Sequence, residues 1–544
     1  MVHERSQEMT GTRIFLREPI LRLLILGLLF VAALGLRLYG INHPPMEFYP
    51  VRQYHGALLA RGFYEWLMTG NLKTVPPDGI IEPPILELAT SLAYLVFGEH
   101  LWIPRLLSTL CWMVGGVFLY LIAKRIVSPN AAVFSVFFYL FVPYSVFASR
   151  AFMADPLMVM LMVASIFTIL NYHERPSTRR LIVAAVASSI AIFAKPGICL
   201  FQLFGAFVSL AVYRQGLWRS LISPHSLIFA ALSTLPTGLY YLYGTVVATF
   251  LRGQASGKVD PQLLLNVSFW RGWIVSIWVV VGAIAFVGAL FGVLLVRKGL
   301  PRALLIGLWS GYLLFGLTFT HHIHTHSYYS LQLIPVVALS LGPVGASVMT
   351  YLKHTVNPNH LGRVALRSYG TVIVLALSLS VLIVGMVEYK LGLVEYKSSI
   401  SHIAEQERVA PIYARYVATL QEIGEVVDHS DRTLFLYGCP RFVGESNCGW
   451  ALMYHGRLSG HSWQYPERII REGRIQMVLD NKRDIDTERR FSQRLKNRSP
   501  EYFIVSKGWW KEEETKELRR LLTENFPVTA RGADYVVFHL TEKT

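Results

Sequence analysis

The chain has little charge for its length and lacks several motifs that define soluble enzymes. Asp, Glu, Lys and Arg make up only 16% of its 544 residues, while 53% are hydrophobic. This composition is too apolar for an ordinary soluble enzyme. No Walker or GxGxxG fingerprint occurs, so nucleotide-driven chemistry is not supported, and no HExxH motif indicates a zinc protease. The sequence therefore predicts a polytopic membrane protein.

Cysteine is also scarce. Of the four cysteines, Cys111 and Cys199 lie in apolar runs, and Cys439 and Cys448 lie in the polar C-terminal part. An oxidising compartment would allow Cys439 and Cys448 to form a disulfide, and two free thiols are the alternative. The net charge of +16 does not indicate nucleic acid, because Lys and Arg punctuate apolar runs and form no basic face with aromatic residues.

Long apolar runs divide the chain into about eleven predicted membrane spans, each of roughly 17 to 25 residues, which is enough to cross about 30 Å of hydrocarbon. They are residues 20–38, 102–127, 131–148, 155–172, 181–195, 197–213, 225–243, 273–295, 303–320, 331–352 and 369–387. Residues 85–97 are apolar but too short to span the membrane, and charged residues flank them. A helix lying in the membrane interface is expected there.

The distribution of Lys and Arg predicts the orientation of these spans. All the basic clusters between spans fall on one side of the membrane. They are Arg5 to Arg22, Lys124 with Arg125, Arg175 with Arg179 and Arg180, Arg214 with Arg219, Arg297 to Arg302, and Lys353 to Arg367. The positive-inside rule identifies that side as cytoplasmic. We expect an integral protein of the plasma or inner membrane, with a cytoplasmic N-terminus and an extracytoplasmic C-terminal part.

Polar residues without an obvious structural role collect on the opposite, outer side. The loop of residues 44–88 follows the first span and is long, aromatic, rich in proline and charged with both signs. Arg150, Asp155 and Lys195 lie at span ends on the same side, and so does the run HHIHTHSYYS of residues 321–330. Ionisable groups near membrane depth are costly and tend to be retained for function. One outward-facing site is therefore expected.

Most of these residues have a plainer structural alternative. A proline follows Asp155, so its carboxylate could simply cap a helix. Lys195 could extend its ammonium group to the interface. Arg61 and Glu65, four residues apart on a predicted helix at 51–68, could pair only with each other. Glu47 has no obvious structural role and is the candidate for catalysis.

The composition becomes polar after Lys390. Strand-like segments there alternate with a helical one. They are TLFLYG from Thr433, EYFIVS from Glu501 and DYVVFHL from Asp534, with the helical EETKELRRLLTENF from Glu513. The sequence predicts a transmembrane module over 1–389 and a soluble α/β domain over 390–544 on the outer side. Such a domain could recognise an acceptor or cover the site.

The order of these features resembles the GT-C glycosyltransferases, in particular the protein O-mannosyltransferase and lipid A aminoarabinose transferase branch. In that family an acidic residue near the start of the first outer loop precedes a helix ending in Ala-Arg; here Glu47 and RQYHGALLAR take those places. A proline-containing stretch, a helix ending in Phe-Gly and an Arg-Leu-x-Ser motif follow, as in EPPILELATSLAYLVFGEHLWIPRLLS. Later family features are matched by Asp155-Pro156, Lys195 and the run 326–335.

The resemblance covers roughly residues 20–339 and implies a mainly α fold of GT-C type. It implies a hexosyl- or pentosyltransferase that moves a sugar from a polyprenyl-phosphate donor to a hydroxyl of a protein, lipid or glycan, with inversion. Phosphate is a good leaving group, so one base should suffice where glycoside hydrolases use two carboxylates. Glu47 is that predicted base, and Asp155 is a second catalytic residue or an organiser of Arg150. The donor-binding residues implied are Arg52, Arg150, Lys195, Glu82, His326, Tyr328 and Tyr329.

Metal dependence stays open at this point. The resemblance implies that Glu82 with His324 or His326 could hold a divalent metal, and polar substrate contacts are the alternative for the histidines. Glu47 stands where the family usually has Asp. Glu82-Pro83-Pro84 stands where the aminoarabinose transferases have Glu-Lys-Pro, which counts against aminoarabinose as the sugar.

Two other classes of protein remain as alternatives. A secondary transporter also has many spans and rare ionisable residues, but its site lies near the membrane midplane between repeated halves. No internal repeat is apparent here, and the charges gather at the outer rim. A non-catalytic receptor built around the outer domain would leave the charged first loop unexplained.

Overall fold

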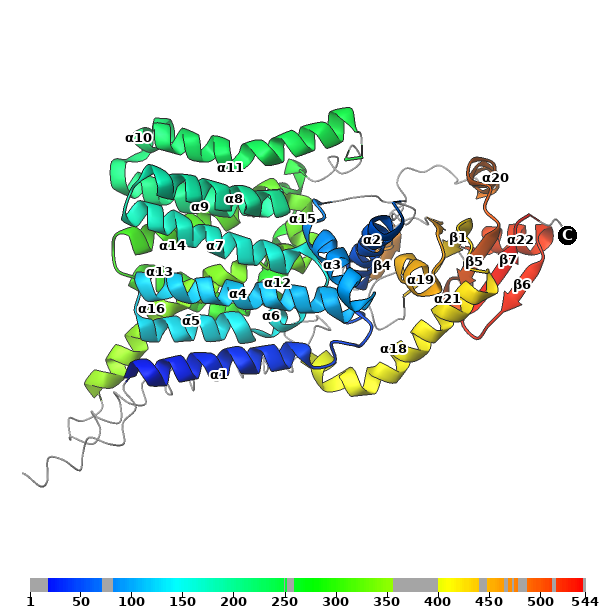
Figure 1. Cartoon of the computed structure of the whole chain (residues 1–544), viewed down its shortest axis with the longest axis horizontal. Coiled ribbons are helices and arrows are strands. Elements are labelled where there is room, and N and C mark those ends of the chain that lie inside the picture. Colours follow the sequence, from blue (N-terminus) through cyan, green and yellow to red (C-terminus); the bar gives the residue numbers. More distant parts are fainter. Residues whose placement is uncertain are drawn as a thin grey trace, which may run out of the picture. The chain divides into compact units, whose positions relative to one another are not determined.

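The computed structural model describes residues 18–70, 82–248, 250–251, 259–355, 400–439, 448–463, 468–471, 474–477, 487–510 and 515–541. Its contacts divide the chain into two compact units, which are described separately (Figure 1). The first unit comprises Met1–Ile41, Ile81–Ile85 and Arg105–Ser401, and the second comprises Asn42–Ile80, Leu86–Pro104 and His402–Thr544. The predicted boundary between residues 389 and 390 lies outside the described residues.

The first unit consists of helices, and Figure 1 shows the longer ones running side by side. The main ones are α1 (Glu18–Leu38), α4 (Trp102–Ile126), α5 (Pro129–Phe141), α6 (Pro143–Ala148), α7 (Ala154–Glu174), α8 (Thr178–Ala194), α9 (Pro196–Gln215), α11 (Pro224–Leu242), α12 (Val267–Val281), α13 (Ala283–Leu295), α14 (Leu300–Thr318) and α16 (Leu333–Thr355). Short helices α10 (Leu217–Ile222) and α15 (Thr320–Thr325) and the turns η1 (Tyr243–Val247), η3 (Pro261–Leu265) and η4 (Ser327–Ser330) connect them.

These helices confirm a mainly α membrane fold. Helices occupy ten of the predicted spans, and the eleventh, 369–387, lies outside the described residues. By length and hydropathy, six of the described helices can cross a membrane, or seven if one bent pair counts as a single span. The chain is thus an integral membrane protein, and the number of eleven spans stays a prediction.

Two predicted spans are interrupted. The span 273–295 is the pair α12 and α13, bent by 89°. Gly282 separates the two helices with φ of 79°, a left-handed conformation that glycine adopts without a Cβ clash. The span 131–148 is α5 and α6, which break at Val142 because Pro143 lacks an amide hydrogen and disfavours a helical conformation in the residue before it. Hydropathy averages over a window and does not reveal such breaks.

Arg37 of α1 is fully buried next to the break between α5 and α6. Its guanidinium donates to Ser149 Oγ at 2.6 Å, to Ala33 O at 3.0 Å and to Leu140 O at 2.8 Å. The helix break leaves Leu140 O available, and a buried charge requires such hydrogen bonds. Sequence reasoning missed Arg37, although a lone charge inside an apolar run is itself a signal.

Close packing also depends on small residues. Helices α9 and α14 approach most closely where Gly205 faces Gly307, because a Cβ added to Gly205 would lie 2.3 Å from Gly307 O. Packing of this kind lets backbones meet where lipid offers no hydrophobic driving force between helices.

The second unit contains most of the loop of residues 44–88 and the C-terminal domain. The loop forms α2 (Pro50–Thr69) and α3 (Ile85–Phe97), which confirms both predicted loop helices. The C-terminal domain has a five-stranded sheet in the order β2-β1-β5-β7-β6. Its strands are β1 (Thr433–Leu436), β2 (Gly460–Ser462), β5 (Tyr502–Ser506), β6 (Val528–Arg531) and β7 (Tyr535–His539); β3 (Arg468–Arg471) and β4 (Arg474–Met477) form a separate pair.

Helices complete this domain, and one of them, α22, forms where the sequence predicts a helix from Glu513. They are α18 (Ile400–Val426), α19 (Gly449–Gly456), α20 (Thr487–Arg498), α21 (Lys507–Trp510) and α22 (Lys516–Asn525). Strand β1 pairs in parallel with β2 and β5, and β7 pairs antiparallel with β5 and β6. The core packs Leu434, Phe503 and Phe538 against Leu522 of α22. An α/β domain after residue 390 is therefore present.

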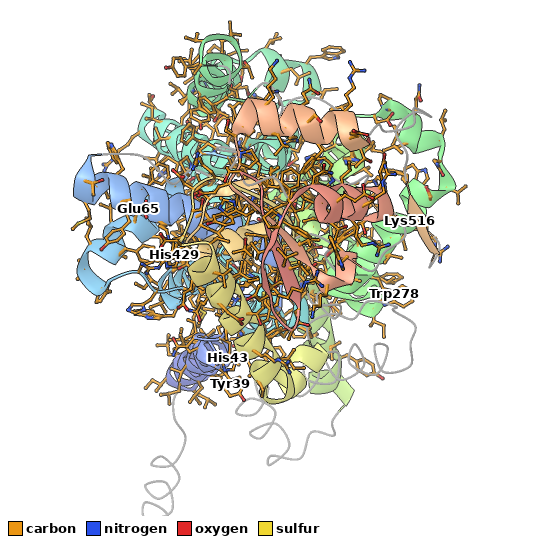
Figure 2. The ribbon with its side chains drawn as sticks, turned by 90° about the vertical axis from the view of Figure 1, so that its right-hand side faces the viewer. Tyr39, His43, Glu65, Trp278, His429 and Lys516 are labelled. Atoms are coloured by element: carbon orange, nitrogen blue, oxygen red, sulfur yellow. A yellow bond between two sulfur atoms is a disulfide. The ribbon has the colours of Figure 1, made fainter. Side chains whose placement is uncertain are left out.

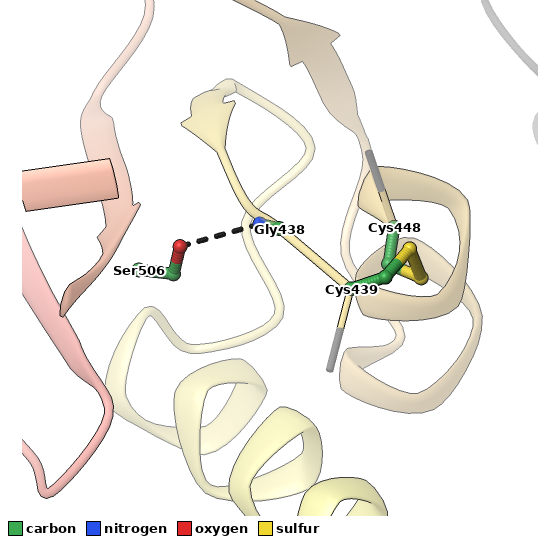
Figure 3. Close-up of a disulfide and its surroundings, with 4 residues drawn as sticks. All are labelled: Gly438, Cys439, Cys448 and Ser506. Carbon is green, nitrogen blue, oxygen red and sulfur yellow. Dashed lines mark hydrogen bonds between the residues drawn. A yellow bond between two sulfur atoms is a disulfide. The ribbon is translucent and has the colours of Figure 1, made fainter. Parts of the chain in front are cut away.

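A disulfide joins Cys439 to Cys448, which confirms the predicted pairing and makes the alternative of two free thiols wrong (Figure 3). Cys439 follows β1, and Cys448 immediately precedes α19. Close by, the Gly438 amide donates to Ser506 Oγ at 3.2 Å, and the Cys448 amide donates to Tyr437 O at 3.0 Å. The start of α19 is thus attached to the sheet by covalent and hydrogen bonds.

Helix α18 is attached to α19 by His429, which is labelled in Figure 2. The His429 amide donates to Gly424 O at 2.8 Å, and its ring Nδ1 donates to Gly456 O at 2.8 Å. Gly424 lies directly against Gly456, since an added Cβ would be 2.1 Å from its carbonyl oxygen. Helix α19 is therefore fixed at both ends.

Candidate active site

A buried ion pair lies in the first unit where three helix ends meet. Lys195 sits between the end of α8 and the start of α9, and Asp155 lies in the first turn of α7. Lys195 Nζ donates to Asp155 Oδ1 at 2.9 Å and to Oδ2 at 2.8 Å. The two side chains are only 4% and 3% exposed. At this depth, removing either charge would leave the other poorly compensated.

This geometry overturns two plainer interpretations. Lys195 does not extend to the interface, because its ammonium group is buried against Asp155. Capping is not the whole role of Asp155 either, because the N-cap residue of α7 is Met153 and Asp155 lies in the first turn. The Asp155 carboxylate binds Lys195 from within the first turn.

Glu82 and two tyrosines surround the same ammonium group. Glu82 Oε1 lies 3.4 Å from Lys195 Nζ, and its side chain is 22% exposed. The rings of Tyr328 and Tyr329 have their centroids 5.4 and 5.6 Å from Nζ, within cation–π range. The structure thus brings five of the predicted residues together, with two carboxylates around one ammonium group.

The histidine run extends this aromatic cluster. The His326 ring lies 5.4 Å from that of Tyr328, and the His322 ring lies 4.6 Å from that of Tyr329. His324 instead donates from Nδ1 to Thr320 O at 2.8 Å. Among the described residues, no group of three His, Cys, Asp or Glu side chains could hold a metal ion. Glu82 with His324 or His326 forms no such group, so we derive no step through a metal.

Two buried arginines bind the chain that leaves α1. Arg150 Nη1 donates to Tyr39 O at 2.7 Å, and Arg105 Nη1 donates to Ile41 O at 2.8 Å. Each residue is only 1% exposed. These bonds hold residues 39–41, which lead into the first outer loop. Arg105 is the arginine of the Arg-Leu-x-Ser motif, but sequence reasoning gave it no role.

The second unit contains the other predicted site residues, Glu47 and Arg52. Glu47 lies between Met46 and Phe48, which are only 2% and 6% exposed and anchor the turn. Tyr49 follows with φ of 43°, a left-handed conformation uncommon outside glycine and often found at functional sites. Arg52 lies in the first turn of α2, and both Glu47 and Arg52 are half-buried.

Gln53 supports the turn that carries Glu47. Its side-chain amide is buried and donates to Pro45 O at 3.2 Å and to Phe48 O. Two backbone carbonyls on either side of Glu47 are therefore fixed by one side chain. Nothing in the sequence distinguished Gln53 from other polar loop residues.

Within the second unit, α2 packs against α19 of the C-terminal domain. Arg61 pairs with Glu99 at 2.7 Å, donates to Tyr454 O at 2.9 Å and lies over the Tyr454 ring at 4.0 Å. The predicted pairing of Arg61 only with Glu65 is therefore wrong. Contacts with residues distant in sequence are added to the electrostatic interaction with Glu65, four residues away.

A second contact joins the same two helices. The Tyr54 hydroxyl hydrogen-bonds His455 Nε2 at 2.8 Å, and the His55 ring lies 4.6 Å from that of Trp450. Burial, with a smaller contribution from Arg61, lowers the pKa of His455 from 6.5 to about 3. His455 is therefore neutral at physiological pH.

The lowered pKa of His455 predicts a pH-dependent stability. Between pH 6.5 and 3 the unfolded chain binds a proton that the folded chain does not, so stability falls as pH falls through this window. We expect this residue to lower the free energy of unfolding by about 2 kcal/mol at pH 5 relative to pH 7. His455→Gln keeps a hydrogen-bonding group for Tyr54 and should flatten the slope of melting temperature against pH. An unchanged slope would contradict the buried neutral imidazole.

Comparison with known proteins supports the resemblance read from the sequence. A family model described as Dolichyl-phosphate-mannose-protein mannosyltransferase matches residues 81–241. The crystal structure of ArnT from Cupriavidus metallidurans in the apo state aligns with a TM-score of 0.56 and 17% identity, over 94% of this chain and 97% of that chain. The same protein bound to undecaprenyl phosphate gives a TM-score of 0.54 and 16% identity, over the same shares. No curated protein matches the chain.

The fold therefore places the chain in the class of polytopic membrane proteins with a small C-terminal α/β domain and a buried charged cluster at helix ends. Within that class, the chain shares its fold with ArnT, and part of it matches the mannosyltransferase family model; both findings support the resemblance to the GT-C glycosyltransferases. The matched stretch 81–241 contains Glu82, Arg150, Asp155 and Lys195.

Proposed function

We propose that the chain is a membrane glycosyltransferase that moves a sugar from a polyprenyl-phosphate donor to an acceptor hydroxyl on the extracytoplasmic face, with inversion at the anomeric carbon. The buried cluster of Lys195, Asp155 and Glu82 carries this proposal. It lies in the stretch that matches the mannosyltransferase family model. The similarity to an ArnT structure bound to undecaprenyl phosphate supports the class of donor.

In this proposal Lys195 stabilises the phosphate as it leaves. The bond between the anomeric carbon and the phosphate oxygen breaks, and negative charge grows on that oxygen. An ammonium group in a low-dielectric site stabilises such charge more strongly than it would in water. Asp155, with two oxygens at 2.9 and 2.8 Å, keeps the ammonium group in place. Asp155 therefore acts as a positioning residue.

Glu82 is the carboxylate that the donor phosphate displaces from its contact with Lys195. Its contact with Lys195 is longer, at 3.4 Å, and its side chain is more exposed than that of Asp155. A phosphate that takes this place keeps the ammonium group neutralised. Tyr328 and Tyr329 then present aromatic faces beside the phosphate, where the sugar lies. His326 contacts these rings and extends the sugar-binding surface.

Glu47 completes the reaction as the base. Its carboxylate accepts the proton of the acceptor hydroxyl as that oxygen attacks the anomeric carbon from the side opposite the phosphate. The products are the inverted glycoside, protonated Glu47 and the free polyprenyl phosphate. Arg52 and Arg150 are proposed to bind the phosphate through charge-assisted hydrogen bonds.

A panel of donors tests the proposal directly. The purified full-length chain is incubated with polyprenyl phosphates carrying different hexoses and pentoses, and mass spectrometry follows release of the free lipid phosphate. We expect one donor to be consumed, with a glycoside of inverted configuration when an acceptor is added. Flux of a substrate across vesicles without any glycosylated product would contradict the enzyme and favour a transporter.

A further inference from the structure

A basic pocket lies in the first unit at the ends of α4, α7 and α8, and the proposed reaction does not use it. Its volume is about 940 Å³. It is lined by Arg125, Thr168, Asn171, Glu174, Arg175, Ser177, Arg179, Arg180 and Val183. Four guanidinium groups therefore surround the cavity with one carboxylate among them. The positive-inside rule predicts this end of the helices on the cytoplasmic side.

Two of the four arginines, Arg125 and Arg180, bind neighbouring protein groups. Arg125 lies over the Phe167 ring at 4.4 Å, donates to Asn171 Oδ1 and pairs with Glu174 at 3.5 Å. Arg180 Nη1 donates to Arg175 O at 2.6 Å, which shapes the connection between α7 and α8. These bonds give the pocket a defined wall.

The guanidinium groups of Arg175 and Arg179 are available to a ligand. No described residue pairs with the guanidinium of Arg175 or Arg179, and both side chains are exposed at the pocket. The carboxylate of Glu174 already contacts Arg125. A guanidinium group binds phosphate oxygens through paired, charge-assisted hydrogen bonds, so the unpaired arginines favour a phosphate group.

An apolar stripe leads away from the pocket along α8. Val183, Val186 and Ile190 are 49%, 48% and 49% exposed, and they follow Arg179 at intervals of four, seven and eleven residues, on one helix face. Val183 also lines the pocket itself. On α4, Leu110, Val114 and Val117 form a similar exposed stripe that ends toward Arg125. A charged pocket continued by apolar side chains matches a molecule with a phosphate head and a hydrocarbon tail.

We propose that this pocket binds the phosphate head group of an anionic phospholipid of the cytoplasmic leaflet, with an acyl chain along Val183, Val186 and Ile190. Basic pockets between membrane helices on the cytoplasmic side bind such head groups. The phosphate accepts hydrogen bonds from Arg175 and Arg179, and the stripe distinguishes a lipid from free phosphate. This site does not depend on the proposed transferase reaction.

The test compares lipids on the purified full-length chain in mixed micelles. Melting temperature is measured while phosphatidylglycerol, phosphatidylcholine or inorganic phosphate is titrated, and native mass spectrometry counts retained lipid. We expect phosphatidylglycerol to stabilise the chain more than either alternative. The variant Arg175→Gln/Arg179→Gln/Arg180→Gln should weaken this effect about tenfold or more. The matched control Arg214→Gln/Arg219→Gln/Lys298→Gln removes three exposed cations predicted on the same side and should keep the affinity.

Each contrary outcome is distinct. An equal loss in the control variant would show that diffuse surface charge attracts the lipid and would overturn the site. Inorganic phosphate binding as tightly as phosphatidylglycerol would overturn the lipid as its ligand. If the triple variant does not fold, lipid binding is measured on Arg175→Gln/Arg179→Gln instead. This double variant removes only guanidinium groups without a described partner, and unchanged binding in it would overturn the site. Donor turnover in detergent should be unchanged in these variants, so failure of this proposal leaves the transferase assay unaffected.

Discussion

Replacing Lys195 with methionine is expected to abolish measurable sugar transfer and to destabilise the first unit. Breaking a buried ion pair by removing one partner costs about 3 to 5 kcal/mol, because the remaining charge stays in the low-dielectric interior. Loss of the ammonium group beside the leaving phosphate should lower the rate by a further factor of about 10² to 10³. Melting temperature and release of polyprenyl phosphate measure the two effects separately.

Two further variants separate stability from chemistry. The double variant Lys195→Met/Asp155→Asn removes the two most buried charges, leaves the more exposed Glu82, and should recover much of the lost stability without recovering transfer. Lys124→Met removes an exposed lysine at the opposite end of the bundle and should change neither property. Full transfer by folded Lys195→Met would remove this residue from the reaction. If the double variant is as unstable as the single variant, the unpaired Asp155 carboxylate is not the cause of the lost stability.

Replacing Glu47 with glutamine is expected to lower sugar transfer by about 10² to 10⁴, because the amide cannot accept the proton of the acceptor hydroxyl. Stability should change by less than about 0.5 kcal/mol, since Glu47 is half-buried and the turn is anchored by Met46, Phe48 and Gln53. Donor binding should persist, so the loss belongs in kcat and not in the affinity for the donor.

Glu65→Gln is the matched control for this substitution. It makes the same chemical change on α2, in the same unit, and should leave transfer intact. Unchanged transfer in Glu47→Gln would exclude Glu47 as the base. In that event Glu82→Gln becomes the next variant, because Glu82 is an acidic residue of the same loop and contacts Lys195.

Prediction from sequence succeeded for helices and strands whose formation depends on the hydrophobic pattern of one segment alone. Apolar runs long enough for a span became helices, and the amphipathic segment 85–97 became helix α3 with those same bounds. Strands predicted from Thr433, Glu501 and Asp534 all formed, because alternating or continuous β-branched and aromatic residues favour a pleated, buried surface. The spacing of apolar residues within one segment decides which face can be buried, so this periodicity is sufficient to predict the helix or strand.

Prediction failed where a partner distant in the chain decides the outcome. Arg61 had a suitable neighbour in Glu65 four residues away, yet it pairs with Glu99 and Tyr454. His455 carried no local signal, and its lowered pKa arises from burial and, to a smaller degree, from Arg61. The bend at Gly282 was invisible to hydropathy, since both halves are apolar.

By itself, the sequence determined that this is an integral membrane protein with a mainly α fold of GT-C type, a charged loop after the first span and a C-terminal α/β domain, because composition and order of motifs are properties of the chain alone. Only the tertiary structure decided that Lys195 binds Asp155 and Glu82 under Tyr328 and Tyr329. The physical reason is that a buried charge requires a partner at about 3 Å, and such a partner comes from whichever helix end folding brings there.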